Sequence, residues 1–259
     1  MKQTLIQTIT GNVGHFVALI SLILVAFAIT YFAERKARQR EEKEGLRPEA
    51  MFSIRKIAII GVFSAIAFVL MLLEFPILLF APDFYKFDFS DIPALIGGFA
   101  AGPMVAVMIE FIKVALNILI DGSSTGFVGE IANFVVGAAF VVPATVIYRF
   151  KKTRKVALIS CLTGTLCIAF VGATLNAFFL LPAYAALFGS GIENFIAAGT
   201  EINSLVTNVF TFCALCVAPF NLIKGVADSA ITFLVYKQLS PILKADIQAV
   251  SKAAKAEEA

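Results

Sequence analysis

The sequence has little charge, a single histidine and no nucleotide-binding motif. Only 15% of its 259 residues are Asp, Glu, Lys or Arg, whereas about a quarter of a soluble globular domain is charged. With His15 as the one histidine, a His-rich metal site is excluded. No G-x-x-x-x-G-K-[ST] stretch occurs, so the chain has no phosphate-binding loop for ATP. Transport against a gradient would therefore take its energy from a partner protein.

Cysteine is scarce as well, with four residues in the chain. Cys213 and Cys216 form a C-x-x-C inside "TFCALCVAPF", with no histidine or acid beside them. This setting favours small apolar side chains in a packed interior over metal ligands. A disulfide between the two stays an alternative if the segment faces outside.

Apolar residues are abundant: 59% of the chain is hydrophobic, and the mean hydropathy is +0.90. These values indicate an all-α, polytopic membrane protein. A run of about 20 apolar residues crosses about 30 Å of hydrocarbon, and residues 15–32 form the first such run. No A-x-A cleavage site follows, so we expect an N-terminal anchor with a charged cytoplasmic linker rather than a signal peptide.

The expected domains are the anchor and linker over 1–50, a membrane body over 51–240 and a cytoplasmic tail over 241–259. Gly and Pro in "GGFAAGP" divide one apolar stretch of the body into two helices. Six helices then form the body, with one extra transmembrane helix in front. The spans expected in the body lie at about 55–80, 91–101, 103–120, 127–149 and 155–187, with a last one ending near Tyr236.

The start of the last span depends on Pro219, because proline is favoured in the first turn of a helix. We expect this span to begin near Val217 and residues 192–215 to form an outer loop with its own helix. Lysine and arginine set the orientation. Seventeen of the 21 lie at 35–56, at 149–155 or after residue 236. The body is therefore expected to start and end in the cytoplasm, with the N-terminus outside.

Several polar residues interrupt the apolar spans. A charge in hydrocarbon costs about 2.5–3.5 kcal/mol on insertion scales, so each should face the protein interior. Two sets are spaced at i, i+3 and i+7, which places their members on one helix face. Amides offer a donor and an acceptor together, as a planar ligand edge with C=O and N–H groups requires. The residues are Glu110, Lys113 and Asn117; Asn221, Lys224 and Asp228; and Glu130, Asn133 and Asn176.

Structural roles are the alternative for these residues. Glu110 could neutralise Lys113, and Lys224 could pair with Asp228, while asparagines also join membrane helices without binding a ligand. The loop "FAPDFYKFDFSDIP" (80–93) also allows both a binding and a structural interpretation. Its aromatic residues could stack on a flat ring or form an interfacial belt.

Four segments together resemble the riboflavin-specific substrate-binding subunits of energy-coupling factor (ECF) transporters. They are "KFDFSDIPALIGGFAAGP", "IEFIK", "GEIANFVVG" and "PFNLIKG", and the likeness covers roughly residues 55–240. The resemblance implies a six-helix body in the cell membrane that binds riboflavin near the outer surface, as transported ligand and not as cofactor. It also implies docking to a transmembrane coupling subunit driven by two ATPases, and no nucleic-acid partner.

The resemblance implies roles for individual residues. In the family, an asparagine late in the fifth helix and an Asn-x-x-Lys pair in the sixth hold the flavin ring, which here are Asn176, Asn221 and Lys224. Small residues in the first body helix would meet the coupling subunit; in "AIIGVFSAIA" these are Ala58, Gly61 and Ala65. Gly61 departs from the more usual alanine. The further ligand-binding residues expected are Asp88, Glu110, Lys113 and Asn133, and neither a metal site nor a catalytic residue is expected.

The choice of ligand follows from charge. A phosphate site requires arginine or a group of N–H donors, and the outer loops offer only Lys86 against six carboxylates. Uncharged riboflavin is therefore favoured over FMN and FAD. The alternatives are a subunit for FMN or another vitamin such as pantothenate, and a stand-alone membrane carrier or enzyme. An enzyme would have only Glu110, Glu130 or Lys113 as its reactive group.

Overall fold

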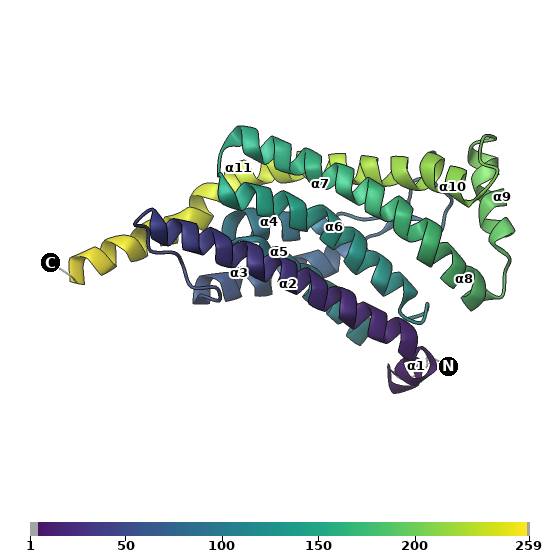
Figure 1. Cartoon of the computed structure of the whole chain (residues 1–259), viewed down its shortest axis with the longest axis horizontal. Helices are drawn as coiled ribbons and strands as arrows, with labels where there is room; N and C mark the ends of the chain where they lie inside the picture. The colour runs from purple at the N-terminus through teal and green to yellow at the C-terminus, as the bar shows by residue number, and fades with distance from the viewer. Residues whose placement is uncertain (1–4, 258–259) are drawn as a thin grey trace.

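The protein is a bundle of helices (Figure 1). This computed structural model describes the backbone of residues 5–257 and the side chains of residues 6–236 and Gln238. One two-stranded antiparallel sheet, β1 (Phe75–Pro76) with β2 (Lys86–Phe87), lies between α3 and α4. The helices are α1 (Leu5–Gly11), α2 (Val13–Lys43), α3 (Ile54–Leu72), α4 (Asp91–Ala101), α5 (Pro103–Ile120), α6 (Val128–Phe150), α7 (Arg154–Leu175), α8 (Leu181–Phe188), α9 (Ile192–Ile202), α10 (Val209–Phe212) and α11 (Ala218–Glu257), with π-helical turns η1 (Asn176–Leu180) and η2 (Cys213–Val217).

Six helical spans of the described chain are long and apolar enough to cross a membrane: α2, α3, α5, α6, α7 with α8, and α10 with α11. The eleven-residue α4 is too short to cross. It packs instead against α3, α5, α6 and α11 in the interior of the bundle. The expected body of six helices with one extra helix in front is confirmed, and α4 is its short, buried member.

The division between α4 and α5 is also confirmed. Gly102 has φ +107°, a conformation that a side chain would strain, and Pro103 then opens α5, where its missing N–H costs nothing. Gly98, in the same segment, allows close packing of α4 against α6, because a Cβ there would overlap the side chain of Thr145 on α6. The "GGFAAGP" segment therefore both ends α4 and lets α6 approach it closely.

Two expected helix boundaries were wrong. Helix α3 ends at Leu72 and not near residue 80, because Pro76 cannot continue a helix and pairs instead in β1. The last span begins at Val209 and not near Val217, so Pro219 lies inside it. The π-helical turn η2 explains this, because the Ala218 N–H bonds to the Cys213 oxygen five residues back. The helical hydrogen bonds have thus already shifted from the i−4 to the i−5 pattern next to Pro219, which has no backbone N–H to donate.

Helix α2 lies along α5 and α6, where Leu19, Ile23 and Ala26 pack against Phe127 and Phe134. It is longer than the expected apolar run, because the helix continues through the charged stretch as far as Lys43. In Figure 1 it runs along the bundle as the long purple helix. The extra helix is thus packed against the body along its length.

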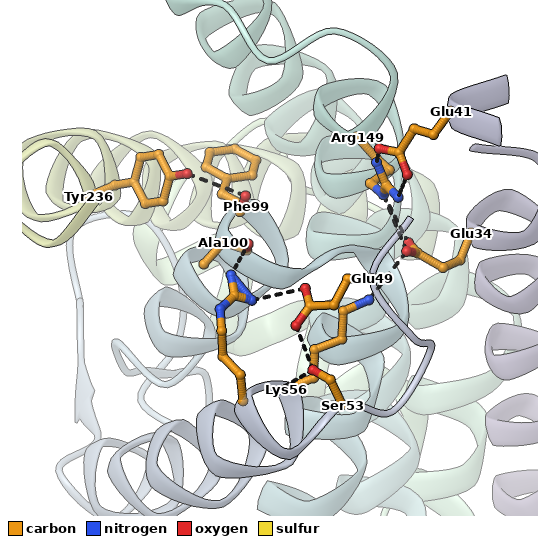
Figure 2. A network of polar contacts seen from close by, with 10 residues as sticks. Glu34, Glu41, Glu49, Ser53, Lys56, Phe99, Ala100, Arg149 and Tyr236 are labelled. Carbon is orange, nitrogen blue, oxygen red and sulfur yellow. Dashed lines mark hydrogen bonds and ion pairs between the residues drawn. The ribbon is translucent and has the colours of Figure 1, made fainter. Parts of the chain in front are cut away.

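Buried ion pairs join the C-terminal half of α2 to the body (Figure 2). The Glu34 carboxylate is fully buried, 3.4 Å from the Lys56 ammonium of α3 and 3.2 Å from the Arg149 guanidinium of α6. A second guanidinium nitrogen of Arg149 donates to Glu41 at 2.9 Å. Gly102 makes room for this group, since a Cβ there would lie 2.5 Å from a Glu34 oxygen. We call Glu34, Glu41, Lys56 and Arg149 the α2 ion cluster.

Candidate functional site

A second group of buried charges lies where α4, α5 and α11 meet. On α5, the Lys113 ammonium lies 2.6 Å from Glu110 one turn earlier and 2.7 Å from Asp91 at the start of α4, and it donates to the Ser90 hydroxyl at 3.0 Å. Gly137 of α6 leaves the space for these carboxylates, because a Cβ there would lie 2.5 Å from a Glu110 oxygen. Lys113 therefore has three polar partners, one on its own helix and two at the start of α4.

Lys224 on α11 lies on the other side of Asp91. Its ammonium donates to the Asp88 backbone oxygen at 2.7 Å and lies 3.3 Å from the side chains of both Asp88 and Asp91. Asp228, one turn further along α11, is 3.8 Å away. We call Asp88, Asp91, Glu110, Lys113, Lys224 and Asp228 the buried ion cluster.

Two asparagines lie beside each other near this cluster. Asn176 opens η1 and donates to the Gly172 oxygen at 2.8 Å, while Asn221 donates to the Val217 oxygen at 3.0 Å. Gly172 brings them together, since a Cβ there would lie 2.7 Å from the Asn221 amide nitrogen. Each asparagine is thus associated with a π-helical turn, a feature that often occurs at functional sites.

The loop between α3 and α4 covers these polar groups with aromatic rings. The Tyr85 hydroxyl donates to the Asn176 side-chain oxygen at 2.6 Å, and its ring packs 5.8 Å from that of Phe220. Burial raises the pKa of the Tyr85 hydroxyl well above its ordinary value, so the group stays a donor. The Phe87 ring lies 5.6 Å from the Lys224 ammonium. Pairing of β2 with β1 holds this part of the loop in place.

The arrangement offers two amides, an ammonium group and several aromatic faces next to one another. The family model for "ECF transporter, substrate-specific component" matches residues 55–236, which include all of these groups. The chain therefore belongs to the substrate-specific components of ECF transporters. Such components are parts of transporters and not enzymes, and this one is a multi-pass membrane protein that acts with other ECF transporter components.

Individual relatives agree with the family model. The chain is 33% identical to the riboflavin transporter FmnP of Bacillus subtilis over 195 residues, which cover 73% of this chain and 93% of the relative. It is 32% identical to the riboflavin transporter RibU of Staphylococcus aureus over 200 residues, or 77% and 98% of the two chains. A solved structure of the S component of a bacterial ECF transporter aligns with a TM-score of 0.57 and 33% identity, covering 73% of this chain and 97% of that one.

Six of the seven expected ligand-binding residues of this substrate-specific component lie buried in one region. They are Asn176, Asn221, Lys224, Glu110, Lys113 and Asp88. The seventh, Asn133, is exposed on α6 and stands apart from the buried ion cluster. The two ion pairs weighed as structural alternatives, Glu110 with Lys113 and Lys224 with Asp228, are both present. Expected binding roles and observed pairing thus involve the same side chains.

Sequence reasoning missed Tyr85 and Asp91 as individual members of the site. Asp91 is the first residue of α4 and lies between the two lysines. An acid in the first turn of a predicted helix could have marked it, because such acids favour helix N-termini. For Tyr85 no local pattern was available, because its contact with Asn176 joins residues 91 positions apart.

The expected docking residues Ala58, Gly61 and Ala65 are exposed on one face of α3. A Cβ at Gly61 would meet nothing within 4 Å. The cysteines are all free thiols, with Cys213 and Cys216 buried in η2. The alternative of a disulfide between Cys213 and Cys216 is therefore wrong.

Proposed function

We propose that this substrate-specific component binds riboflavin at Asn176, Asn221 and Lys224 and delivers it to an ECF transporter for uptake. The observation that supports this most is the convergence of two amides and one ammonium group from η1 and α11 beneath an aromatic loop. An isoalloxazine edge carries alternating carbonyl and N–H groups, which match amide and ammonium partners. The relatives named riboflavin transporters point to the same ligand.

Each polar group has a distinct role in this proposal. Asn176 and Asn221 each use one amide N–H on their own helix, and the Asn176 oxygen accepts from Tyr85, so the second N–H of each asparagine and the Asn221 oxygen would serve the ring. Lys224 would donate to a ring acceptor in place of the Asp88 backbone oxygen. Tyr85 and Phe87 would supply apolar faces for the ring. The loop that carries Tyr85 and Asp88 would then move and close over the vitamin.

Charge favours the unphosphorylated vitamin. The buried ion cluster holds four carboxylates against two lysines. A phosphate next to it would face more negative than positive charge, and no arginine lies in the cluster. Riboflavin is therefore preferred over FMN. Glu110, Lys113 and Asp88 would support Lys224 in position rather than bind phosphate.

The partners proposed are a transmembrane coupling subunit and two ATPase subunits. The exposed face of α3 with Ala58, Gly61 and Ala65 would meet the coupling subunit, because small residues allow two helices to approach closely. The positive-inside rule supports a plasma-membrane orientation with the N-terminus outside and the C-terminus in the cytoplasm. The proposed cytoplasmic tail, 241–259, has side chains outside the described residues.

Quenching of riboflavin fluorescence by the purified protein tests the site directly. We expect tight binding by the wild type and affinity about tenfold or more weaker, roughly 1.4 kcal/mol, for Asn221→Ala and for Lys224→Ala. Lys86→Ala is the matched control, because Lys86 is an exposed lysine of the same loop. Wild-type protein that quenches FMN or binds pantothenate but not riboflavin would contradict the assignment.

A further inference from the structure

Asp228 is the least satisfied charge in the buried ion cluster. Its side chain is fully buried, and neither carboxylate oxygen accepts a hydrogen bond from any described residue. The nearest cation, the Lys224 ammonium, is 3.8 Å away and makes its shortest contact, 2.7 Å, with the Asp88 backbone oxygen. A carboxylate in such surroundings has lost its hydration without a compensating partner.

The other three carboxylates of the cluster each lie closer to a cation or a donor, although neither Glu110 oxygen accepts a hydrogen bond. Asp88 accepts the Ser90 backbone N–H at 2.7 Å. Asp91 accepts a hydrogen bond from the Lys113 ammonium at 2.7 Å, and Glu110 lies 2.6 Å from the same nitrogen. The start of α4 also places a partial positive charge of about half an elementary charge beside Asp91. Asp228, at 3.8 Å, is therefore the carboxylate of the cluster that lies farthest from a cation.

The charge balance leads to the same residue. With every group ionised, four carboxylates and two lysines would leave two negative charges inside the bundle. The partial charge of α4 offsets only part of this excess. A metal ion does not offer a solution, because the described residues contain no group of three or more His, Cys, Asp or Glu that could hold one. A bound proton removes one charge without needing space.

We propose that Asp228 carries a proton, and that its ionisation competes with the ligand for Lys224. The second half of this statement rests on the proposed function. With Asp228 neutral, the Lys224 donors are available to the Asp88 backbone or to the ligand. With Asp228 ionised and its proton released to water, the carboxylate draws the ammonium toward itself along α11. Ligand affinity therefore falls as pH rises through the titration of Asp228.

The charged groups that act on Asp228 come from its own helix and from three other elements. They are Lys224 on α11, Asp88 in the loop, Asp91 on α4 and Lys113 on α5, and none supplies a second cation as close as Lys224. On α7, which also packs against α11, the Cys161 thiol bonds to Ser229, the residue after Asp228.

Infrared spectroscopy tests the proton without reference to any ligand. We expect a carboxylic-acid C=O stretch in the wild type that is missing in Asp228→Asn and retained in Asp83→Asn, which changes an exposed loop aspartate. Asparagine has the shape of a neutral aspartic acid, so Asp228→Asn should keep the thermal stability of the wild type. A wild-type spectrum with no acid band assignable to Asp228, or a large loss of stability in this variant, would overturn the proposal.

Riboflavin affinity measured by quenching between about pH 6 and about pH 9 tests the competition, since carboxyl groups with ordinary surroundings do not titrate there. We expect wild-type affinity to fall by about tenfold or more over this range. Asp228→Asn should bind with constant affinity, and Asp83→Asn should follow the wild type. A flat wild-type profile would refute the competition. An acid band assigned to Asp228 without riboflavin binding at any pH would instead refute the proposed function alone.

Discussion

At the scale of single residues, the candidate site depends on a missing side chain as much as on the polar ones. Gly172 lies on α7 directly against the Asn221 amide, and both asparagines reach the same small region because no Cβ stands between them. Glycine in a membrane helix is often a packing residue. Here it sets the position of an amide of the proposed binding site.

Gly172→Ala should therefore separate binding from stability. The new methyl carbon would lie 2.7 Å from the Asn221 amide nitrogen, and this end of a flexible side chain can move aside. We expect riboflavin affinity to weaken about tenfold while the free energy of unfolding changes by less than about 1 kcal/mol. Fluorescence quenching and thermal unfolding in detergent measure the two quantities. Gly61→Ala is the control, because that position is open; equal binding by both variants would refute this role for Gly172.

At the scale of helices, buried ion pairs hold α2 against the body in addition to apolar contacts. Glu34 has Lys56 and Arg149 as partners, and Lys56 is itself buried. Two body helices thus present cations that α2 neutralises. This makes α2 part of the packed structure, although the match to the solved relative leaves about a quarter of this chain uncovered.

Glu34→Gln should destabilise the protein strongly. Removing one partner of a buried ion pair costs about 3–5 kcal/mol, because the remaining charges stay buried without compensation. Thermal unfolding in detergent measures the effect. Glu44→Gln removes the exposed pair with Arg40, and such pairs contribute about 0–1 kcal/mol. If both variants unfold at the same temperature, the α2 ion cluster does not hold the helix in place.

The elements differ in how far the sequence could predict them. The division of 91–120 was predictable because Gly102 and Pro103 act locally, through a positive φ and a missing N–H. The start of the last span was not predictable in this way. An i−5 hydrogen bond such as that of Ala218 has no residue signature, so Pro219 was assigned to a first turn. The polar residues of the site could be selected from the cost of burying them in a membrane, and the pairs within one helix from their spacing. The pairs of Lys224 and Lys113 with Asp91 depend on contacts between different helices.

At the scale of the whole molecule, the proposed ligand site and the expected docking face lie on different elements. Asn176, Asn221 and Lys224 are on η1 and α11, while Ala58, Gly61 and Ala65 are exposed on α3. We therefore expect that substitutions can change binding and assembly independently. The long α2 lies along α5 and α6, which leaves this face of α3 uncovered.

Gly61→Leu should abolish assembly and keep binding. A large side chain on the exposed face of α3 would hold a partner helix away, and the position has open space within this chain. We expect unchanged riboflavin quenching but loss of ATP-dependent uptake in cells that also express the coupling and ATPase subunits. Val62→Leu, which changes a neighbouring exposed residue, is the control. Normal uptake by Gly61→Leu would place the partner on another face.

The α2 ion cluster also has a consequence for biosynthesis. Proteins are made from the N-terminus, and α2 leaves the ribosome before any other long helix of this chain. Its Glu34 then meets Lys56 soon afterwards, but Arg149 is still more than a hundred residues away along the chain. Until Arg149 has been made, Lys56 is the one of the two cationic partners of Glu34 that the chain already contains. The contact between α2 and α6 at Glu34 can therefore form only after the chain has been made as far as Arg149.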